Sequence, residues 1–181
     1  NIVRKLETEL ELPRLMPMLI KNKGDYIDLS NVIFNPYVLK LYERRVSKLF
    51  GQSNITSVVT VATDGIPLAV VAASALRARL TIAKQYKDAG FEEFYESSYI
   101  VDSPPRRTSI YLPKDLLGRK DKVLIVDDIM RTGRTMDALL NIIRQAGASI
   151  GGFSILVARR NGVLDFIKGK INVPVDVLHL Q

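Results

Sequence analysis

The chain has 181 residues, a formal net charge of +7, 47% hydrophobic residues and no cysteine. This length is typical of one domain with a buried core, so we expect residues 1–181 to form a single domain. The absence of cysteine excludes disulfide bonds and thiolate metal sites and fits a reducing, cytoplasmic location. No apolar run reaches the roughly 20 residues of a membrane helix, so no membrane is expected, and the charged start is unlike a signal peptide.

The excess positive charge has more than one explanation. Several cations lie close together in the sequence: Arg106, Arg107, Lys114, Arg119, Lys120 and Lys122. A polyphosphate ligand accounts for such an excess as well as a nucleic acid does. The sequence has no RNA-binding aromatic signature and no zinc-ligand spacing. We therefore do not expect nucleic acid as a partner.

The first fifty residues are predicted to form two helices around a turn-rich arm. Residues 1–22 have apolar side chains at helical spacing, and Pro13 and Pro17 are expected to interrupt that helix. Residues 25–35 are expected to be an extended arm. Residues 37–50 again show helical spacing.

Beyond residue 50, short apolar runs alternate with helical segments. Strands are expected at 57–61, 80–83, 123–126, 153–158 and 173–178, and helices at 66–77 and 136–143. This alternation predicts an α/β fold, in which a twisted parallel sheet is covered by helices on both faces. Ligands of such sheets bind beyond the carboxyl ends of the strands. The loops at 62–65 and 127–135 are expected at those ends.

Residues 123–135, with the sequence VLIVDDIMRTGRT, form the most specific pattern in the chain. Asp127 and Asp128 are expected where the strand ends, and they can accept hydrogen bonds from vicinal ribose hydroxyls or hold a divalent cation. The following turn contains Gly133 and leads into a helix, whose first N–H groups suit a phosphate. Each part alone also fits an ordinary strand–turn–helix with charged caps. The combination predicts a sugar-phosphate site.

This segment resembles the phosphoribosyl pyrophosphate (PRPP) signature of the type I phosphoribosyltransferases. The resemblance implies that Asp127 and Asp128 are the catalytic carboxylates and bind the ribose 2- and 3-hydroxyls. It further implies a 5-phosphate site formed by Met130, Arg131, Thr132, Gly133, Arg134 and Thr135. Mg²⁺ is implied as the cofactor, held through PRPP, with Asp127 and Asp128 as candidate ligands.

A second segment extends the resemblance to the pyrophosphate group. The residues Ala62, Thr63, Asp64 and Gly65 match the family's pyrophosphate loop, which often contains a cis peptide. A plain turn with Asp64 as a helix cap is the alternative. Lys84 matches a basic residue that contacts pyrophosphate, and Lys87 could share that role. A solvated lysine is the alternative at position 84.

The stretch 87–115 corresponds to the family's flexible loop, which closes over the active site and excludes water. Its Arg106 and Arg107 could reach the diphosphate. The same stretch could also form an ordinary hairpin, because aromatic and acidic residues are mixed within it.

The base is expected under a hood formed by residues 1–50, over a PRPP-binding core of residues 51–181. The arm at 28–36 resembles that of xanthine phosphoribosyltransferase and the purine repressor group. In it, Asn35 and Phe34 are candidates for base contact, although either could be a turn former or a core residue. Arg159 follows the strand at 153–158, where related 6-oxopurine enzymes place a lysine toward the base oxygen.

The resemblance implies a purine phosphoribosyltransferase of purine salvage. Its acidic, tyrosine-bearing flexible loop slightly favours adenine, giving AMP and pyrophosphate. A 6-oxopurine (hypoxanthine, guanine or xanthine) is the alternative substrate, because Arg159 can only donate hydrogen bonds. A PRPP-sensing regulator of the purine repressor type is the other alternative, for which residues 1–22 are too short to form the DNA-binding module unless an N-terminal extension has been lost. A homodimer or higher homo-oligomer is expected, with the N-terminal helix as its contact.

Overall fold

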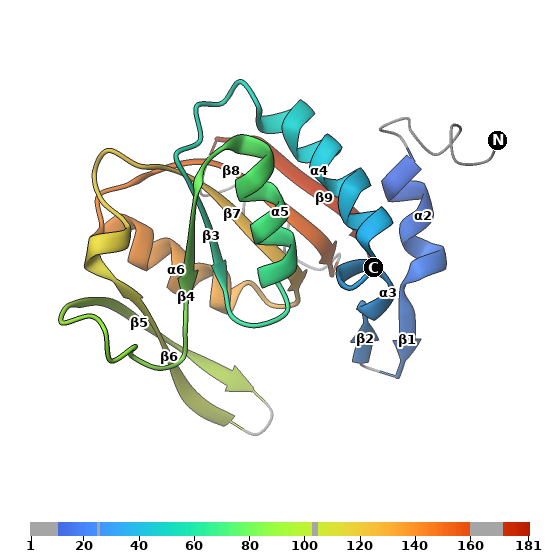
Figure 1. The fold of residues 1–181 in the computed structure, drawn as a ribbon. Coiled ribbons are helices and arrows are strands. Elements are labelled where there is room, and N and C mark those ends of the chain that lie inside the picture. Colours follow the sequence, from blue (N-terminus) through green and yellow to red (C-terminus); the bar gives the residue numbers. More distant parts are fainter. Residues whose placement is uncertain (1–10, 25, 103–104, 160–171) are drawn as a thin grey trace.

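A five-stranded parallel sheet forms the centre of the fold, in the order β4-β3-β7-β8-β9 (Figure 1). Its strands are β3 (Ser57–Val61), β4 (Arg79–Ala83), β7 (Lys122–Met130), β8 (Ser149–Ala158) and β9 (Val175–Leu180). The computed structural model describes residues 11–24, 26–102, 105–159 and 172–181. The predicted α/β fold with a parallel sheet is confirmed.

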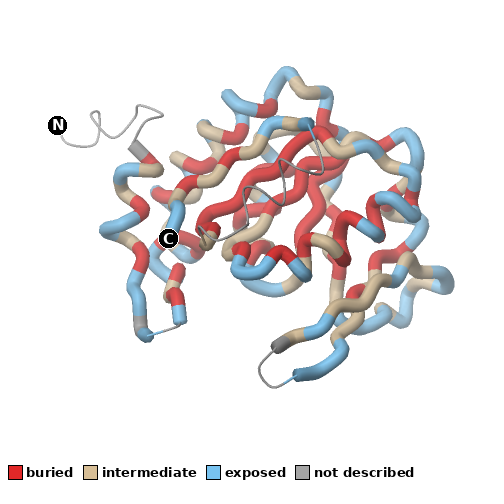
Figure 2. Tube along the Cα trace, turned by 180° about the vertical axis from the view of Figure 1, so that it is seen from behind, coloured by how far each residue is buried: buried red, intermediate tan, exposed pale blue. Residues whose placement is uncertain are grey.

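Helices cover both faces of this sheet. One face carries α2 (Glu11–Leu19), α3 (Ser30–Ile33), α4 (Pro36–Phe50) and α5 (Ile66–Leu76), and the other carries α6 (Arg134–Gln145). Successive strand residues point to opposite faces: Val58 belongs to the hydrophobic cluster under α4 and α5, and Val59 to the cluster under α6. The strands are consequently the most deeply buried part of the chain (Figure 2).

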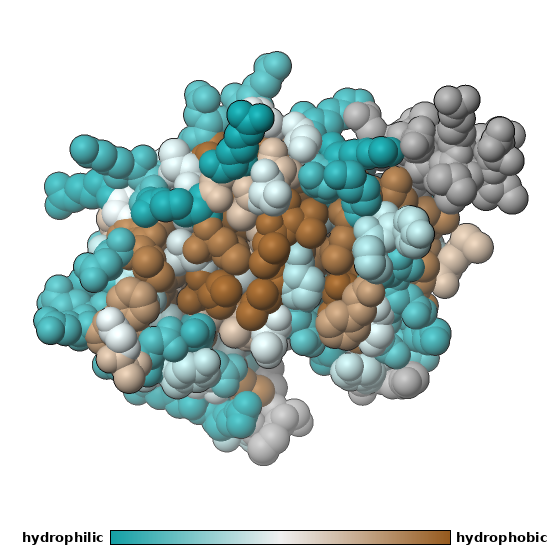
Figure 3. All heavy atoms as spheres, in the orientation of Figure 1, coloured by the Kyte–Doolittle hydropathy of each residue, from teal (hydrophilic) through white to brown (hydrophobic). Residues whose placement is uncertain are grey.

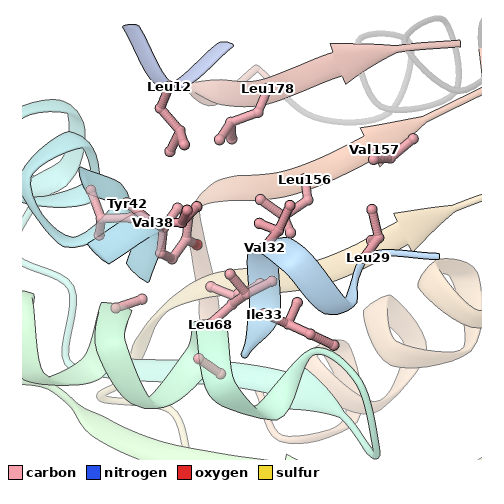
Figure 4. Close-up of a cluster of buried hydrophobic side chains, with 14 of the residues drawn as sticks. Leu12, Leu29, Val32, Ile33, Val38, Tyr42, Leu68, Leu156, Val157 and Leu178 are labelled. Atoms are coloured by element: carbon pink, nitrogen blue, oxygen red, sulfur yellow. The ribbon is translucent and has the colours of Figure 1, made fainter. Parts of the chain in front are cut away.

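The described part of residues 11–50 shares one hydrophobic core with the sheet. Figure 4 shows Leu12 of α2 beside Leu178 of β9, and Tyr42 of α4 close to Leu68 of α5. The hydroxyl groups of Tyr42 and Ser154 are 3.0 Å apart in a buried hydrogen bond. This packing holds α4 along the sheet, from α3 beside the carboxyl end of β7 to Phe50 against Gly152 near the start of β8.

The expectation that prolines interrupt the N-terminal helix is wrong for Glu11–Leu19. Pro13 lies in the first turn of this segment, where a backbone N–H has no acceptor within the helix, so the missing N–H of proline costs no hydrogen bond there. Pro17 is exposed. Leu12 and Met16, which are fully buried, anchor the helix to the core. Residues 1–10 lie outside the described residues. No described helix is long and apolar enough to cross a membrane.

The arm and the long polar stretch each contain an antiparallel hairpin. In the arm, β1 (Lys21–Lys23) pairs with β2 (Tyr26–Asp28). In the stretch that the sequence marks as a flexible loop, β5 (Phe94–Asp102) pairs with β6 (Pro105–Pro113), followed by a 3-10 turn at Lys114–Leu116. The β5–β6 hairpin packs along α6, where Gln145 Nε2 donates to the Glu96 carbonyl at 2.9 Å.

Strand β7 is longer than its apolar pattern predicts. It pairs with β8 as far as Met130 opposite Ala158, although it pairs with β3 only from Ser57 to Val59. Asp127 and Asp128 therefore lie within the strand and not after it. The apolar run ends at Val126 because Asp127 and Asp128 are polar, but the backbone ladder with β8 continues to Met130.

Candidate functional site

Asp127 and Asp128 lie on the end of β7 that extends past β3. Because they are neighbours in a strand, their side chains point to opposite sides. Asp127 lines one cavity and Asp128 lines another. The two cavities adjoin, since Ile129 and Arg131 line both of them.

The first cavity, which we call the turn cavity, has a volume of about 340 Å³. Its floor is the turn between β7 and α6, and strand β5 supplies Tyr99, Ile100 and Val101 on the other side. The six residues expected at the 5-phosphate all line it: Met130, Arg131, Thr132, Gly133, Arg134 and Thr135. The structure thus brings the whole segment around one hollow.

The amino end of α6 faces this cavity without a side-chain cap. Gly133 is its N-cap residue, with φ +76°, a conformation that other residues adopt only under strain. The first-turn N–H groups donate to no capping side chain, so they suit an anion. The Met130 side chain lies in the hydrophobic core and offers the cavity little but its backbone. Its carbonyl already accepts from Arg159 N at 3.1 Å.

The second cavity, which we call the arm cavity, has a volume of about 300 Å³. The arm supplies one wall, with Tyr26, Ile27, Leu29, Ser30, Ile33 and Phe34. The core supplies the other wall, with Asp64, Asp128, Ile129 and Arg131. The arm and the PRPP-like motif therefore face each other across this cavity.

The loop at 62–65 connects β3 to α5, and its Asp64 lines the arm cavity. The Ala62–Thr63 peptide bond is cis, as the resemblance implies for this loop. A Cβ atom on Gly65 would stand 3.6 Å from Asp127 Oδ1, so the loop touches β7 directly. Gly65 is itself the N-cap residue of α5 and no side chain caps that helix. The alternative of Asp64 as a helix cap is therefore wrong, and Asp64 lines the arm cavity instead.

The two central carboxyl groups have raised pKa values. Burial raises the pKa of Asp127 well above its ordinary value, and the neighbouring charge of Asp128 raises it further. Burial also raises the pKa of Asp128, with a contribution from the charge of Asp64. The raised pKa values of both groups therefore follow from burial first and from neighbouring carboxylates second.

The two lysines expected at the pyrophosphate lie outside both cavities. Lys84 Nζ forms an ion pair with Asp88 Oδ1 at 3.0 Å, and this hydrogen bond raises the lysine pKa. Lys87 Nζ lies 5.0 Å from the centre of the Tyr111 ring. Both side chains are engaged at the base of the β5–β6 hairpin. Lys84 follows Ala83, whose carbonyl accepts from Ala62 N at 2.9 Å, so its backbone lies beside the loop at 62–65 while its side chain pairs with Asp88.

The three candidates for base contact are in different situations. Phe34 lines the arm cavity and is 69% exposed. Asn35 is the N-cap residue of α4, and its Oδ1 accepts from Tyr37 N at 3.1 Å. Arg159 lines neither cavity. Of the alternatives for Asn35, the turn former is the one that the structure bears out.

Sequence reasoning missed most of the arm wall, including Ser30. Asp28 Oδ1 accepts from Ser30 N at 3.0 Å and from Ser30 Oγ at 2.6 Å. This is the pattern of an Asx turn, which the Asp-Leu-Ser sequence could have indicated. The turn fixes Ser30 on the cavity wall.

The described residues contain no site in which protein side chains alone could hold a metal ion. They contain no group of three or more His, Cys, Asp or Glu side chains that could hold an ion. Asp127 and Asp128 supply hard oxygen donors, and Mg²⁺ usually completes its shell with waters and substrate oxygens. The donors therefore fit an ion shared with a phosphorylated ligand.

Two kinds of curated protein resemble this chain in sequence. The chain is 31% identical over 134 residues to the purine biosynthesis transcriptional repressor PurR of Bacillus subtilis, covering 74% of this chain and 47% of the repressor. It is 34% identical over 121 residues to xanthine phosphoribosyltransferase of Streptococcus uberis, covering 64% of this chain and 63% of the relative. The chain thus spans about half the length of the purine regulators it matches.

Solved structures match the fold over nearly the whole chain. Adenine phosphoribosyltransferase of Rhodothermus marinus superposes with a TM-score of 0.79 at 21% identity, covering 95% of this chain and 99% of that one. The enzyme of Thermoanaerobacter pseudethanolicus gives 0.80 at 16% identity, covering 93% and 99%. At these identities the likeness is one of fold. The family model for the phosphoribosyl transferase domain matches residues 31–177. The chain therefore belongs to the type I phosphoribosyltransferase family.

Proposed function

We propose that the chain transfers the 5-phosphoribosyl group of PRPP to a purine base and releases pyrophosphate. The observation that carries this proposal is the pair of adjoining cavities that share Ile129 and Arg131. Asp127 faces one cavity and Asp128 the other, so a ribose placed between them could present its hydroxyls to both carboxylates. The 5-phosphate then belongs in the turn cavity and the base in the arm cavity, with residues 1–50 as the hood over a core of residues 51–181.

Each phosphate has a matching set of groups. The 5-phosphate would accept from the uncapped N–H groups of α6 and from the hydroxyls of Thr132 and Thr135. The diphosphate would bind at the loop 62–65, which lies against Asp127. Lys84 and Lys87 would take part only after leaving Asp88 and Tyr111, so we assign the first contacts to the loop.

The reaction breaks the bond between the ribose anomeric carbon and the pyrophosphate oxygen and forms a bond to a purine ring nitrogen. The nitrogen loses its proton, and pyrophosphate leaves with the bonding electrons. Asp127 and Asp128 would orient the ribose and stabilise positive charge that develops on it. Their raised pKa values also allow one of them to hold a proton near the base. Mg²⁺, when bound with PRPP, would neutralise the leaving group.

For the base, the wall chemistry slightly favours adenine. Asp64, Asp128 and the Ser30 hydroxyl can accept hydrogen bonds from an exocyclic amine. Arg159, the donor that favoured a 6-oxopurine, lines neither cavity. The names of the xanthine phosphoribosyltransferases that match this chain favour a 6-oxopurine and keep it as the alternative.

A second candidate function is PRPP sensing within a transcription regulator. It is favoured by the purine regulators among the relatives, of which this chain spans about half the length. The same turn cavity would bind PRPP in that case, without turnover.

One experiment separates these candidates. Pyrophosphate release is measured with PRPP, Mg²⁺ and adenine, hypoxanthine, guanine or xanthine in turn. We expect turnover with adenine, abolished by Asp128→Asn and retained by the exposed control Asp115→Asn. Turnover with a 6-oxopurine alone would move the assignment to that base. PRPP binding without turnover on any base would refute the enzyme and support the sensor.

We also propose a homo-oligomer with α2 in the contact. Met18 on α2 is 80% exposed, which is unusual for a large apolar side chain. Light scattering should give the mass of a dimer for the parent chain. Met18→Glu should shift that mass toward the monomer, and an unchanged mass would place the contact elsewhere.

A further inference from the structure

A belt of positive side chains lies at the end of the sheet opposite the two cavities. We call it the basic edge, and its members lie at the amino ends of strands, in the loops before them or in the last turn of α6: Arg77, Arg79, Arg119, Lys120, Lys122 and Arg144. Figure 3 shows hydrophilic residues along the upper rim of the molecule, where the amino ends of β3 and β4 lie in Figure 1.

The fold assembles this edge from segments that are far apart in the sequence. In the sheet register, Ser57 of β3 lies between Arg79 of β4 and Val123 of β7. With about 4.8 Å between neighbouring strands, the starts of β4 and β7 are about 10 Å apart. Arg106 and Arg107, which cluster with Lys122 in the sequence, lie instead in β6 of the hairpin.

Asp121, the only acidic residue in the described loop before β7, is buried and forms an ion pair with Arg79. Asp121 is buried, and its carboxylate accepts from Arg79, from Thr56 Oγ1 at 2.9 Å and from Gly118 N at 2.9 Å. Burial works to raise the pKa of Asp121, but these hydrogen bonds, led by that of Arg79, outweigh burial and lower it. The carboxylate therefore stays ionised, but it is turned inward and paired.

Three cations of the edge, Arg77, Arg119 and Lys120, face solvent without a carboxylate partner among the described residues. In the described ranges, no ion pair involves the side chain of Arg77, Arg119 or Lys120, and all three residues are exposed. The stem of Arg119 lies over Gly147, whose Cβ would stand 2.8 Å from Arg119 Cγ. Such packing of the stem directs the charged group outward.

The composition of the edge points to one kind of partner. The segments 51–57, 77–80, 118–123 and 144–150 contain no aromatic residue, so the edge cannot stack bases as proteins that bind single strands do. Cations without stacking groups suit phosphates, which position a protein on a duplex without reading its sequence. Contrary to the expectation from the sequence that nucleic acid is not a partner, we propose that the basic edge binds the phosphate backbone of double-stranded nucleic acid. This binding is independent of phosphoribosyl transfer, because the edge and the cavities lie at opposite ends of the sheet.

Fluorescence anisotropy of a labelled DNA duplex of roughly 20 base pairs, titrated with the full chain, tests this proposal. We expect a Kd of about 10⁻⁶ to 10⁻⁴ M that weakens steeply between about 50 and 200 mM salt. The triple variant Arg77→Gln, Arg119→Gln, Lys120→Gln should bind about tenfold more weakly or worse. Its slope of log K against log salt should fall by up to about 2.7, or about 0.9 for each lost phosphate contact.

The matched control is the triple variant Arg14→Gln, Lys21→Gln, Lys40→Gln, which removes the same charge from α2, β1 and α4. It should retain the parent affinity within about twofold. Equal weakening by both triples would overturn the proposal, because binding would then follow net charge alone. Tighter binding of a single strand or of polyglutamate than of the duplex would overturn it as well.

Two further readouts keep the outcomes distinct. Lys120→Gln alone should reduce the salt slope by about 0.9, which covers the case of a triple variant that does not fold. Pyrophosphate release by the edge variants should equal that of the parent. Duplex binding by a chain that shows no transfer with any base would refute the proposed function and leave the basic edge intact.

Discussion

The backbone of Gly65 lies directly against the side chain of Thr60. A Cβ atom on Gly65 would stand 2.6 Å from Thr60 Oγ1, closer than real Cβ atoms approach other heavy atoms, and Thr60 is completely buried. The same atom would lie 3.6 Å from Asp127 Oδ1. The loop after β3 can therefore meet β7 only because residue 65 has no side chain.

Gly65→Ala should damage the site through this contact. The backbone of residue 65, with φ −72°, accepts alanine without strain, so the effect is steric. Overpacking of this kind costs about 1–3 kcal/mol. We expect a lower melting temperature and weaker PRPP binding, measured by calorimetry with and without PRPP and Mg²⁺.

Two controls identify the cause. Gly90→Ala, at a glycine with nothing within 4 Å of its ideal Cβ, should change neither quantity. The double variant Thr60→Ala, Gly65→Ala should recover stability, because the clashing hydroxyl is gone. A double variant that is as unstable as Gly65→Ala would show that the Thr60 contact is not the cause.

The raised pKa of Asp127 predicts a pH dependence of stability. The unfolded chain loses this proton near pH 4, while the folded chain keeps it to higher pH. Between these two pKa values the folded state binds more protons, so its free energy of unfolding falls as pH rises. Asp127→Asn should flatten this fall and raise the melting temperature at pH 7.

Thermal unfolding from about pH 4 to pH 8 tests this prediction. Each kcal/mol regained corresponds to about 2–4 °C for a chain of this size. Asp115→Asn, at an exposed position outside both cavities, should follow the parent curve. Parallel curves for Asp127→Asn and the parent would contradict the assignment. PRPP binding should be lost in Asp127→Asn even though the fold is more stable.

The sequence predicted the sheet well because its signals are local. The β-branched run Ser57–Val61 and the helical spacing of Pro36–Phe50 each match the observed element. The PRPP-like segment also lines one cavity as a unit, since its residues are contiguous. Local patterns failed at Asp127 and Asp128, because the continuation of β7 depends on a ladder with β8 that no apolar pattern marks.

Long-range contacts account for the rest. The docking of the β5–β6 hairpin on α6 joins residues more than thirty positions apart, as with Arg134 and Ile100. The spacing of residues in a sequence does not predict contacts between segments so far apart. The sequence could therefore suggest a mobile loop, but not the surface on which the hairpin packs.

The hydrogen bond from Arg134 to the hairpin predicts a link between the turn cavity and hairpin mobility. Arg134 Nη1 donates to the Ile100 carbonyl at 3.1 Å, at the edge of that cavity. Arg134→Ala should loosen the hairpin by about 1 kcal/mol, or about fivefold faster amide exchange in residues 94–102. It should also raise the KM for PRPP, because Arg134 is a proposed phosphate ligand.

Gln145→Ala provides the matched control for this prediction. It removes a hydrogen bond to the Glu96 carbonyl of the same strand, but Gln145 lies outside both cavities. Hydrogen exchange should rise by a similar factor while the KM for PRPP stays unchanged. If Gln145→Ala raised the KM as much as Arg134→Ala does, the phosphate role of Arg134 would not be needed.

Phe34 and Asn35 are neighbours, yet the structure gives them separable roles. Asn35 caps α4, so Asn35→Ala should cost about 1 kcal/mol of stability, within a range of about 0.5–2, and Asn35→Asp should restore most of it. Phe34 is exposed on the wall of the arm cavity, so Phe34→Ala should leave the melting temperature nearly unchanged and raise the KM for the base. Steady-state kinetics and thermal unfolding of the three variants distinguish the two roles. Asn35→Asp keeps the helix cap, so a loss of the cap could not explain a raised KM for the base in this variant. Such a result would show that Asn35 contacts the base.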